Sequence, residues 1–289
     1  MLTKLVALVD CTKSISPTDM SQTSAALQKQ ATRDLGPIWG IEATVNYFPD
    51  LASVPVGYWP IIIVETLNDP TAGGYHTDQS HQPFSLILRG EGTDWTLDCS
   101  HELCEMLVDP YGNRMTPGQS LKEGQGRVSY LVECCDPCED PNYAYTIDGI
   151  MVSDFYTPQF LAPAVSSGVR YSFNGSITKP LEILPGGYIT WQDPADNSYW
   201  QVQYFNGKRS IVDISTQVAA SAQKTSDNSL RSCVDRITKP TAKERSTSFD
   251  TFRGVKENKA KLGIHAAMRK AQKVNWSNTL KALKIPCAD

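Results

Sequence analysis

The chain has 289 residues, of which 40% are hydrophobic, and its formal net charge is −4 at pH 7. This length is enough for one large domain with an appendage or for two domains. The apolar run near the N-terminus is too short for a signal peptide, and no segment approaches the roughly 18 apolar residues of a membrane span. We therefore expect a soluble protein without an export signal and without a membrane partner.

In the first 110 residues, the sequence predicts four β-strands and two helices. The strands are expected at residues 4–10, 41–48, 59–66 and 84–89, which are rich in β-branched and aromatic residues. The first helix begins after Ser16, an N-cap residue followed by Pro17, and runs to about Leu35. The second helix surrounds His101 and ends before Pro110. The expected fold class is α+β with a mixed sheet.

The rest of the chain divides by composition. Residues 111–127 are expected to form a loop, residues 128–133 a strand, and residues 142–153 a hairpin with Asp148 and Gly149 at its turn. Residues 161–214 are expected to form a β-rich lobe or a hairpin extension. An extended polar linker over 215–253 and a basic helix over 255–276 follow. The predicted domains are 1–160, 161–214 and 215–289.

Charge is distributed unevenly between the body and this tail. Residues 1–219 carry 12 Lys and Arg against 25 Asp and Glu, whereas residues 220–289 carry 15 against 6. An acidic body with a basic tail suggests that the tail docks on the body or on an acidic protein neighbour. The basic residues of the tail are spread out and few aromatic residues accompany them, which argues against a nucleic-acid partner.

The predicted second helix carries the string H-E-L-C-E. His101 and Glu105 are four residues apart and therefore project from the same helical face. A histidine and a carboxylate with this spacing can bind zinc, and Glu102 between them is placed to act as general base toward water. The alternative for so short a string is a surface helix whose polar residues are solvated.

A catalytic zinc site needs a third protein ligand. Glu133, at the end of a predicted strand, is one candidate, and Asp136 is then placed to support His101 from outside the ligand set. Asp109, which follows the helix directly, is the other candidate. Spacing alone leaves both open.

Two histidines precede the fourth predicted strand. We expect His76 and His81 to be exposed in a polar loop. The alternative for His76 is a place in the cleft beside the metal, where it can stabilise an oxyanion. The eight cysteines include one C-x-x-C pair, Cys135 and Cys138, which without a second pair is weak evidence for structural zinc. Without an export signal, buried thiols are the expected state.

The longer pattern S-H-E-L-x-E-M-L-x-D-P, followed by V-E-x-x-D-P, resembles a zincin-like group of metallopeptidases in bacteria and bacteriophages, over about residues 1–160. A related H-E-L-x-E occurs in secreted plant proteins of the exordium type. The resemblance implies a mixed sheet over the metal helix, an edge strand beside the cleft, a zinc cofactor and Glu102 as general base. Glu105 departs from the usual pattern, in which a histidine occupies this position.

Together these features predict a zinc-dependent peptidase whose metal is bound by His101, Glu105 and Glu133 and whose substrate is a peptide or protein. Two carboxylate ligands leave zinc less positive and weaken the acidification of its water. The alternative is therefore a catalytically weak or inactive zincin-fold subunit of a large assembly such as a phage particle. The expected location is the cytoplasm or the virus particle.

Overall fold

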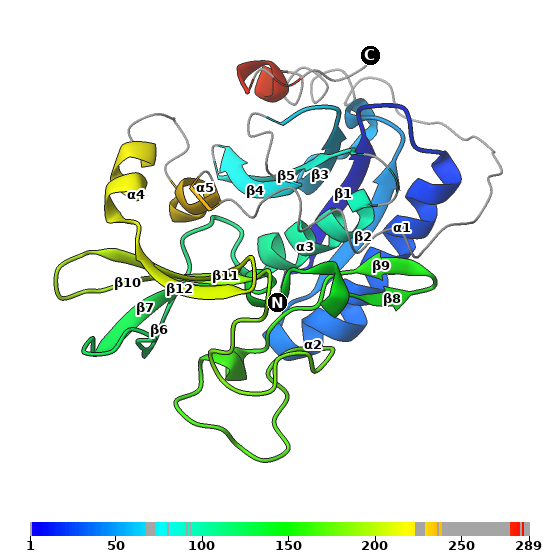
Figure 1. The fold of residues 1–289 in the computed structure, drawn as a ribbon. Helices are drawn as coiled ribbons and strands as arrows, with labels where there is room; N and C mark the ends of the chain where they lie inside the picture. Colours follow the sequence, from blue (N-terminus) through cyan, green and yellow to red (C-terminus); the bar gives the residue numbers. More distant parts are fainter. Residues whose placement is uncertain are drawn as a thin grey trace.

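In the computed structural model, the described residues are 2–67, 73–79, 81–90, 92, 94–222, 229–235, 237–238, 278–283 and 285. They form a mixed α and β fold with two five-stranded sheets and one two-stranded sheet (Figure 1). The predicted α+β class is therefore confirmed.

The first sheet has the strand order β2-β1-β3-β5-β4. Its central pairs are parallel, whereas β4 runs antiparallel to β5 at the edge. Four strands match the predicted segments, but β4 lies where the sequence predicts a loop. The bounds are β1 Lys4–Asp10, β2 Ala43–Phe48, β3 Tyr58–Val64, β4 Gly74–Gln79 and β5 Gln82–Leu88.

Both faces of this sheet are buried. Successive side chains of a strand point to opposite faces, so Val6 and Leu8 of β1 pack in one hydrophobic cluster while Ala7 and Val9 pack in another. Strands covered on both faces have nearly continuous apolar sequences. This explains the uninterrupted apolar runs of β1 and β3.

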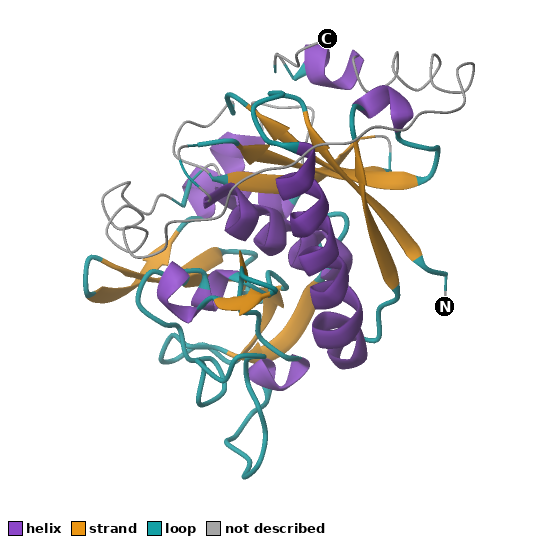
Figure 2. Ribbon diagram, turned by 90° about the vertical axis from the view of Figure 1, so that its right-hand side faces the viewer, coloured by secondary structure: helices purple, strands orange, loops and turns teal. Residues whose placement is uncertain are grey.

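Helices lie along the first of these faces (Figure 2). Helix α1 (Pro17–Lys29) begins as predicted: the Ser16 hydroxyl accepts a hydrogen bond from the Asp19 N–H at 3.1 Å. It continues through a π-helical segment, Gln30–Leu35, into α2 (Gly36–Trp39), and α3 spans Asp94–Val108. Among the described helices, none is long and apolar enough to cross a membrane.

The second sheet is antiparallel, with the order β12-β11-β10-β7-β6. It joins strands from both sides of the predicted boundary at residue 160, and one hydrophobic cluster contains Tyr130 and Trp191 together with Leu8. The predicted β-rich lobe therefore shares a sheet and a core with the body. The bounds are β6 Met115–Gln119, β7 Arg127–Leu131, β10 Tyr188–Gln192, β11 Tyr199–Phe205 and β12 Lys208–Asp213.

Two local predictions in the middle of the chain have different outcomes. The hairpin is confirmed: β8 (Tyr145–Ile147) pairs with β9 (Ile150–Val152), and Asp148 and Gly149 at its turn have φ values of 53° and 83°. Positive φ at both central residues is the requirement of a type I′ turn. The loop predicted for 111–127 instead contains β6, because its residues pair with β7.

The segment after residue 214 contains two helices in place of the first part of the predicted linker. Helix α4 spans Ser215–Ala222 and α5 spans Leu230–Asp235. Cys233 and Val234 of α5 are buried in a cluster with Leu131 and Tyr188, so packing on the second sheet offsets the cost of ordering a polar segment. The basic helix predicted for 255–276 lies outside the described residues.

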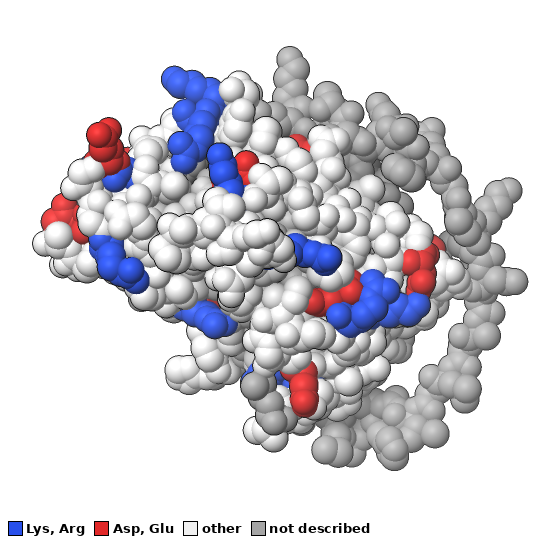
Figure 3. Space-filling view, turned by 90° about the horizontal axis from the view of Figure 1, so that it is seen from below, with Lys and Arg blue, Asp and Glu red and all other residues white. Residues whose placement is uncertain are grey.

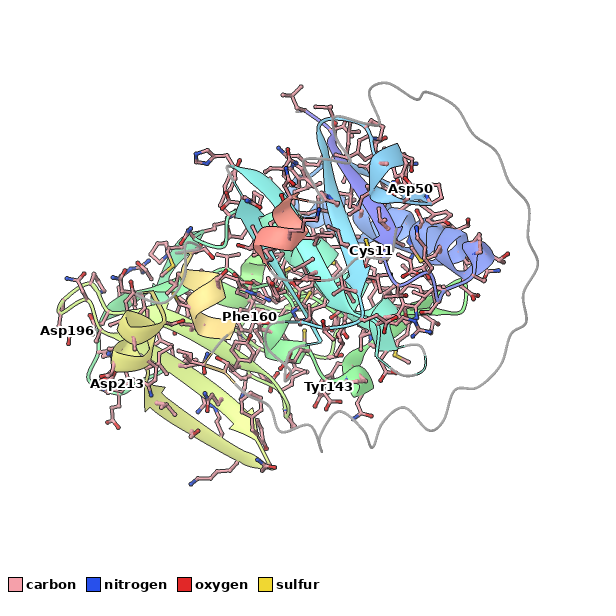
Figure 4. All side chains as sticks on the ribbon, turned by 90° about the horizontal axis from the view of Figure 1, so that it is seen from above. Cys11, Asp50, Tyr143, Phe160, Asp196 and Asp213 are labelled. Carbon is pink, nitrogen blue, oxygen red and sulfur yellow. The ribbon has the colours of Figure 1, made fainter. Side chains whose placement is uncertain are left out.

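The last described residues close the other face of the first sheet. Leu280 and Ile285 are 2% and 4% exposed and pack with Val9 and Cys11, the latter labelled in Figure 4. These apolar side chains of the C-terminal segment therefore cover strands of the core. Cys11 is also in a disulfide, contrary to the expected thiol, although no other described cysteine is its partner.

The acidic excess of the body is in large part interior. Among the described residues, eight carboxylate residues are buried: Asp10, Asp34, Glu102, Glu105, Asp109, Glu133, Asp136 and Asp154. On the face drawn in Figure 3, basic and acidic side chains are interspersed among uncharged ones. Sequence charge alone therefore overstates how acidic a surface the body offers to the basic tail.

Candidate metal centre

Helix α3 positions the H-E-x-x-E residues inside the molecule. Its apolar side chains pack under the first sheet, and most of its residues are buried, including Glu102 and Glu105. The Asp109 N–H donates to the Glu105 carbonyl oxygen at 2.6 Å in the last turn, and Pro110 then disfavours continuation of the helix. The alternative of a solvated surface helix is thus wrong for this segment.

His101 and Glu105 face one another across one turn of α3. The His101 Nε2 atom is 3.2 Å from Glu105 Oε2, and 12% of the imidazole side chain is exposed, whereas Glu105 is completely buried. The other carboxylate oxygen, Oε1, accepts a hydrogen bond from the Cys135 N–H at 3.0 Å. This main-chain donor fixes the orientation of the Glu105 carboxylate toward His101.

Glu133 reaches the same place from the segment that follows β7. Ligand atoms of His76, Glu105 and Glu133 lie within 4.8 Å of one another, as do those of His101, Glu102 and Glu105. The two groups share Glu105. Together they contain all three predicted ligands, His101, Glu105 and Glu133. The structure brings the predicted residues to one buried cluster.

Asp136 lies closer to the ligand set than predicted. Its Oδ1 atom is 3.3 Å from His101 Nε2, the same ring nitrogen that faces Glu105. A residue that supports a metal-binding histidine contacts the other ring nitrogen. Asp136 is therefore a possible ligand itself, and it forms a third group within 4.8 Å with His101 and Glu139.

His76 is not the exposed loop residue that the sequence predicts. It lies on edge strand β4 and is completely buried. Its Nε2 atom is 2.9 Å from the main-chain oxygen of Asp109, and its Nδ1 atom is 3.2 Å from Glu102 Oε2. Because a carbonyl oxygen only accepts, Nε2 carries a proton, and Nδ1 faces Glu102. His81, in contrast, is exposed at the β4–β5 turn.

Asp109 does not enter the cluster through its side chain. Its Oδ2 atom accepts a hydrogen bond from the Arg114 N–H at 2.7 Å, and Asp109 belongs to none of the candidate metal groups of the described residues. Its contribution is the main-chain oxygen that orients His76. Of the two predicted third ligands, the geometry therefore favours Glu133.

The residue that sequence reasoning missed is Arg231 on α5. Its guanidinium forms ion pairs with Glu105 and Glu133, and lies 3.6 Å from Glu102 Oε2 and 3.9 Å from Asp136 Oδ2. The residue is 2% exposed. No motif marks it, because residues 215–253 are polar and carry several basic side chains of similar appearance.

These neighbours set the protonation of the cluster. Burial raises the pKa of Glu105, but Arg231 and His101 outweigh burial and hold that pKa well below its usual value. Burial lowers the pKa of His101, and the adjacent Glu105 and Asp136 outweigh it and raise that pKa well above its usual value. Burial and Glu105 raise the pKa of Asp136. The cluster thus holds a stable Glu105 carboxylate.

Buried thiols lie beside these groups. Cys104, Cys134, Cys135 and Cys138 are free and buried. Burial raises the pKa of Cys135, but hydrogen bonds from Cys104 and Cys134 outweigh it and lower that pKa to about 6. No thiol belongs to a candidate metal group within the described part of the chain. The C-x-x-C pair therefore adds no metal site there.

The donor set fits a divalent cation. Both oxygens of Glu133 and Oδ1 of Asp136 are buried without a hydrogen bond, although Arg231 lies against Glu133 and His101 lies near Asp136. Buried carboxylates need a counter-charge, and imidazole nitrogen together with carboxylate oxygen is a set that zinc accepts. Buried His and Glu side chains here can hold a metal ion.

No family model, curated protein or solved structure matches this chain.

Proposed function

We propose that the protein is a zincin-like, zinc-dependent peptidase. The observation that carries the proposal is the convergence of His101 and Glu105, from one turn of α3, with Glu133 from the segment after β7. The antiparallel edge strand β4, next to the helix, supports the same fold type. His101, Glu105 and Glu133 would hold the metal, with Asp136 as a further carboxylate donor.

Zinc bound there would supply Lewis-acid chemistry, polarising a carbonyl group and acidifying water. Glu102 is the general base in this proposal, because it directly follows His101 and its Oε2 atom lies in the cluster. Burial raises the pKa of Glu102, but Arg231 and the hydrogen bond with His76 lower it, so Glu102 is a carboxylate able to accept a proton. His76 donates its Nε2–H to Asp109, and a proton on Nδ1 as well would let it hold the Glu102 carboxylate in place.

The first test is metal content. Purified protein, equilibrated with excess zinc and desalted, is expected to retain one zinc per chain, and the His101→Ala variant is expected to retain none. Elemental analysis measures both. Equal zinc content in the two proteins would remove His101 from the ligand set.

The second test is catalysis. Glu102→Gln is expected to keep zinc and fold but to lower peptide hydrolysis by about 10²–10⁴-fold, the contribution of a general base. Glu123→Gln, at an exposed position, is the matched control. Hydrolysis at the wild-type rate in Glu102→Gln would exclude the role given to Glu102.

A second candidate function is a structural or docking subunit that keeps this fold without catalysis. The observation that favours it is Arg231, which neutralises the carboxylates from within the chain. Zinc-loaded protein that hydrolyses no peptide in a broad library would favour this candidate.

A further inference from the structure

Helix α5 places the positively charged guanidinium of Arg231 in the candidate metal site. Arg231 is separated from Glu133 by about 100 residues of sequence, yet its guanidinium is paired with both Glu105 and Glu133. A buried ion pair whose partner is removed leaves an uncompensated charge, which is strongly destabilising. Loss of the guanidinium therefore destabilises the cluster unless another cation or protonation neutralises the carboxylates.

A metal ion and the guanidinium compete for the same atoms. The Oε2 atoms of Glu105 and Glu133 contact Arg231 Nη1, and both residues belong to candidate metal groups. A zinc–oxygen bond is about 2.0–2.2 Å long, so an ion bound to both oxygens would overlap the guanidinium. One cation excludes the other.

Specific contacts fix α5 over the cluster. The Arg231 N–H donates to the Gly112 carbonyl oxygen at 3.0 Å, and the Leu230 N–H donates to Asn113 Oδ1 at 2.9 Å. Gly112 has a φ of +61°, and a Cβ there would lie 2.7 Å from the Arg231 Cβ, so glycine permits this close approach. The Ser232 hydroxyl lies 3.4 Å from the Thr77 hydroxyl of β4, beside α5 in Figure 1.

We propose that α5 is an internal plug: Arg231 holds the acidic cluster in the metal-free state, and a divalent ion enters when α5 withdraws. The proposal rests on the metal site proposed above, but it is independent of peptidase activity. With α5 in place, the side chains of Glu102 and Glu133 are each only 4% exposed.

A reversible staple tests the plug without changing a residue of the cluster. In the full-length double variant Thr77→Cys/Ser232→Cys, the native hydroxyl separation of 3.4 Å places the two new thiols within reach of a disulfide. Zinc affinity is measured by competition with a chromophoric chelator, for the oxidised staple and for the staple reduced with a phosphine and desalted. Wild type receives the same two treatments, which controls for the native Cys11 disulfide.

The oxidised staple is expected to bind zinc about tenfold or more weakly than the reduced one, because the apparent Kd rises as the open state becomes rarer. Arg231→Gln, which keeps a polar side chain but no charge, is expected to bind about tenfold more tightly than wild type. Arg209→Gln, an exposed arginine on β12, is the control and should match wild type. His101→Ala, introduced into wild type and into the staple variant, gives the background from other donors, including the two new thiols; only the His101-dependent part of the binding is compared.

The outcomes separate the two proposals. One outcome is zinc binding that His101→Ala abolishes but that is equal in the oxidised staple, the reduced staple and Arg231→Gln. This outcome supports the metal site and overturns the plug. Absence of His101-dependent zinc binding in every form, including Arg231→Gln, overturns the metal site and the plug together.

Discussion

The His76 Nε2–H group donates to the main-chain oxygen of Asp109 at 2.9 Å. This bond joins edge strand β4 to the C-terminal end of α3, and it leaves Nδ1 against the Glu102 carboxylate. One imidazole thereby connects the sheet, the helix and the proposed general base. We therefore expect the buried histidine to stabilise the arrangement of these three parts.

His76→Asn is expected to lower the free energy of unfolding by about 1–3 kcal/mol, because the shorter side chain leaves buried partners without hydrogen bonds. The measurement is urea unfolding in the presence of a chelator. His81→Asn, on the same hairpin but exposed, is the matched control and should change stability by less than about 0.5 kcal/mol. Equal effects of the two substitutions would contradict the role of His76.

A double-mutant cycle measures the pairing of Arg231 with Glu133. In metal-free protein, Arg231→Met is expected to destabilise by about 3–5 kcal/mol, since the carboxylates lose their buried partner. The same substitution in a Glu133→Gln background should cost less, giving a coupling energy of about 0.5–3 kcal/mol. Arg209→Met combined with Glu123→Gln should be additive. Additivity at the buried pair would mean that the ion pair contributes nothing.

Leu280 tests whether the C-terminal segment belongs to the core. Leu280→Ala is expected to destabilise by about 2–5 kcal/mol, the range for a buried leucine. Lys281→Ala changes the next, exposed residue and should have little effect. Thermal melting with the Cys11 disulfide intact measures both. A melting temperature unchanged by Leu280→Ala would show that the C-terminal segment is not part of the core.

Asp154 predicts a pH dependence away from the metal site. Burial raises its pKa, although hydrogen bonds from Asn174 and Ser172 oppose the rise. A carboxyl group with a raised folded pKa binds its proton more tightly in the folded state, so its favourable contribution is present below the unfolded pKa and is lost as pH rises through the folded pKa. Its ionisation above that pH therefore lowers stability relative to acidic conditions.

Asp154→Asn removes this titration while its amide oxygen can still accept from the Phe155 and Asn174 N–H groups. We expect the stability of the variant relative to wild type to be greater at pH 7 than at pH 4. Urea unfolding at the two pH values measures the difference. A constant difference between the proteins would show that Asp154 does not change its protonation on folding.

Local sequence patterns predicted the elements whose partners are near in sequence. His101 and Glu105 could be paired because helical geometry alone places them on one face. The Asp148–Gly149 turn could be predicted because its backbone requirement is local. The apolar runs of β1 and β3 identify buried strands for the same reason.

These local patterns could not predict contacts between residues that are distant in the sequence. Gly74–Gln79 is polar, and only its pairing with β5 makes it a strand and buries His76. Arg231 has no distinctive neighbours, and its burial depends on carboxylates that the fold assembles from distant segments. Leu280 and Ile285 are too few to predict a core position, yet they complete one face of the first sheet.

Because Arg231 follows the carboxylates of the cluster in the sequence, it is synthesised after them. A ribosome adds about 5–20 residues per second, so the roughly 100 residues between Glu133 and Arg231 take about 5–20 s. During that interval α3 and the Glu133 segment can leave the ribosome before their arginine exists. A divalent ion available to the nascent chain would then meet the carboxylates first, and Arg231 would compete with it only once α5 has been made.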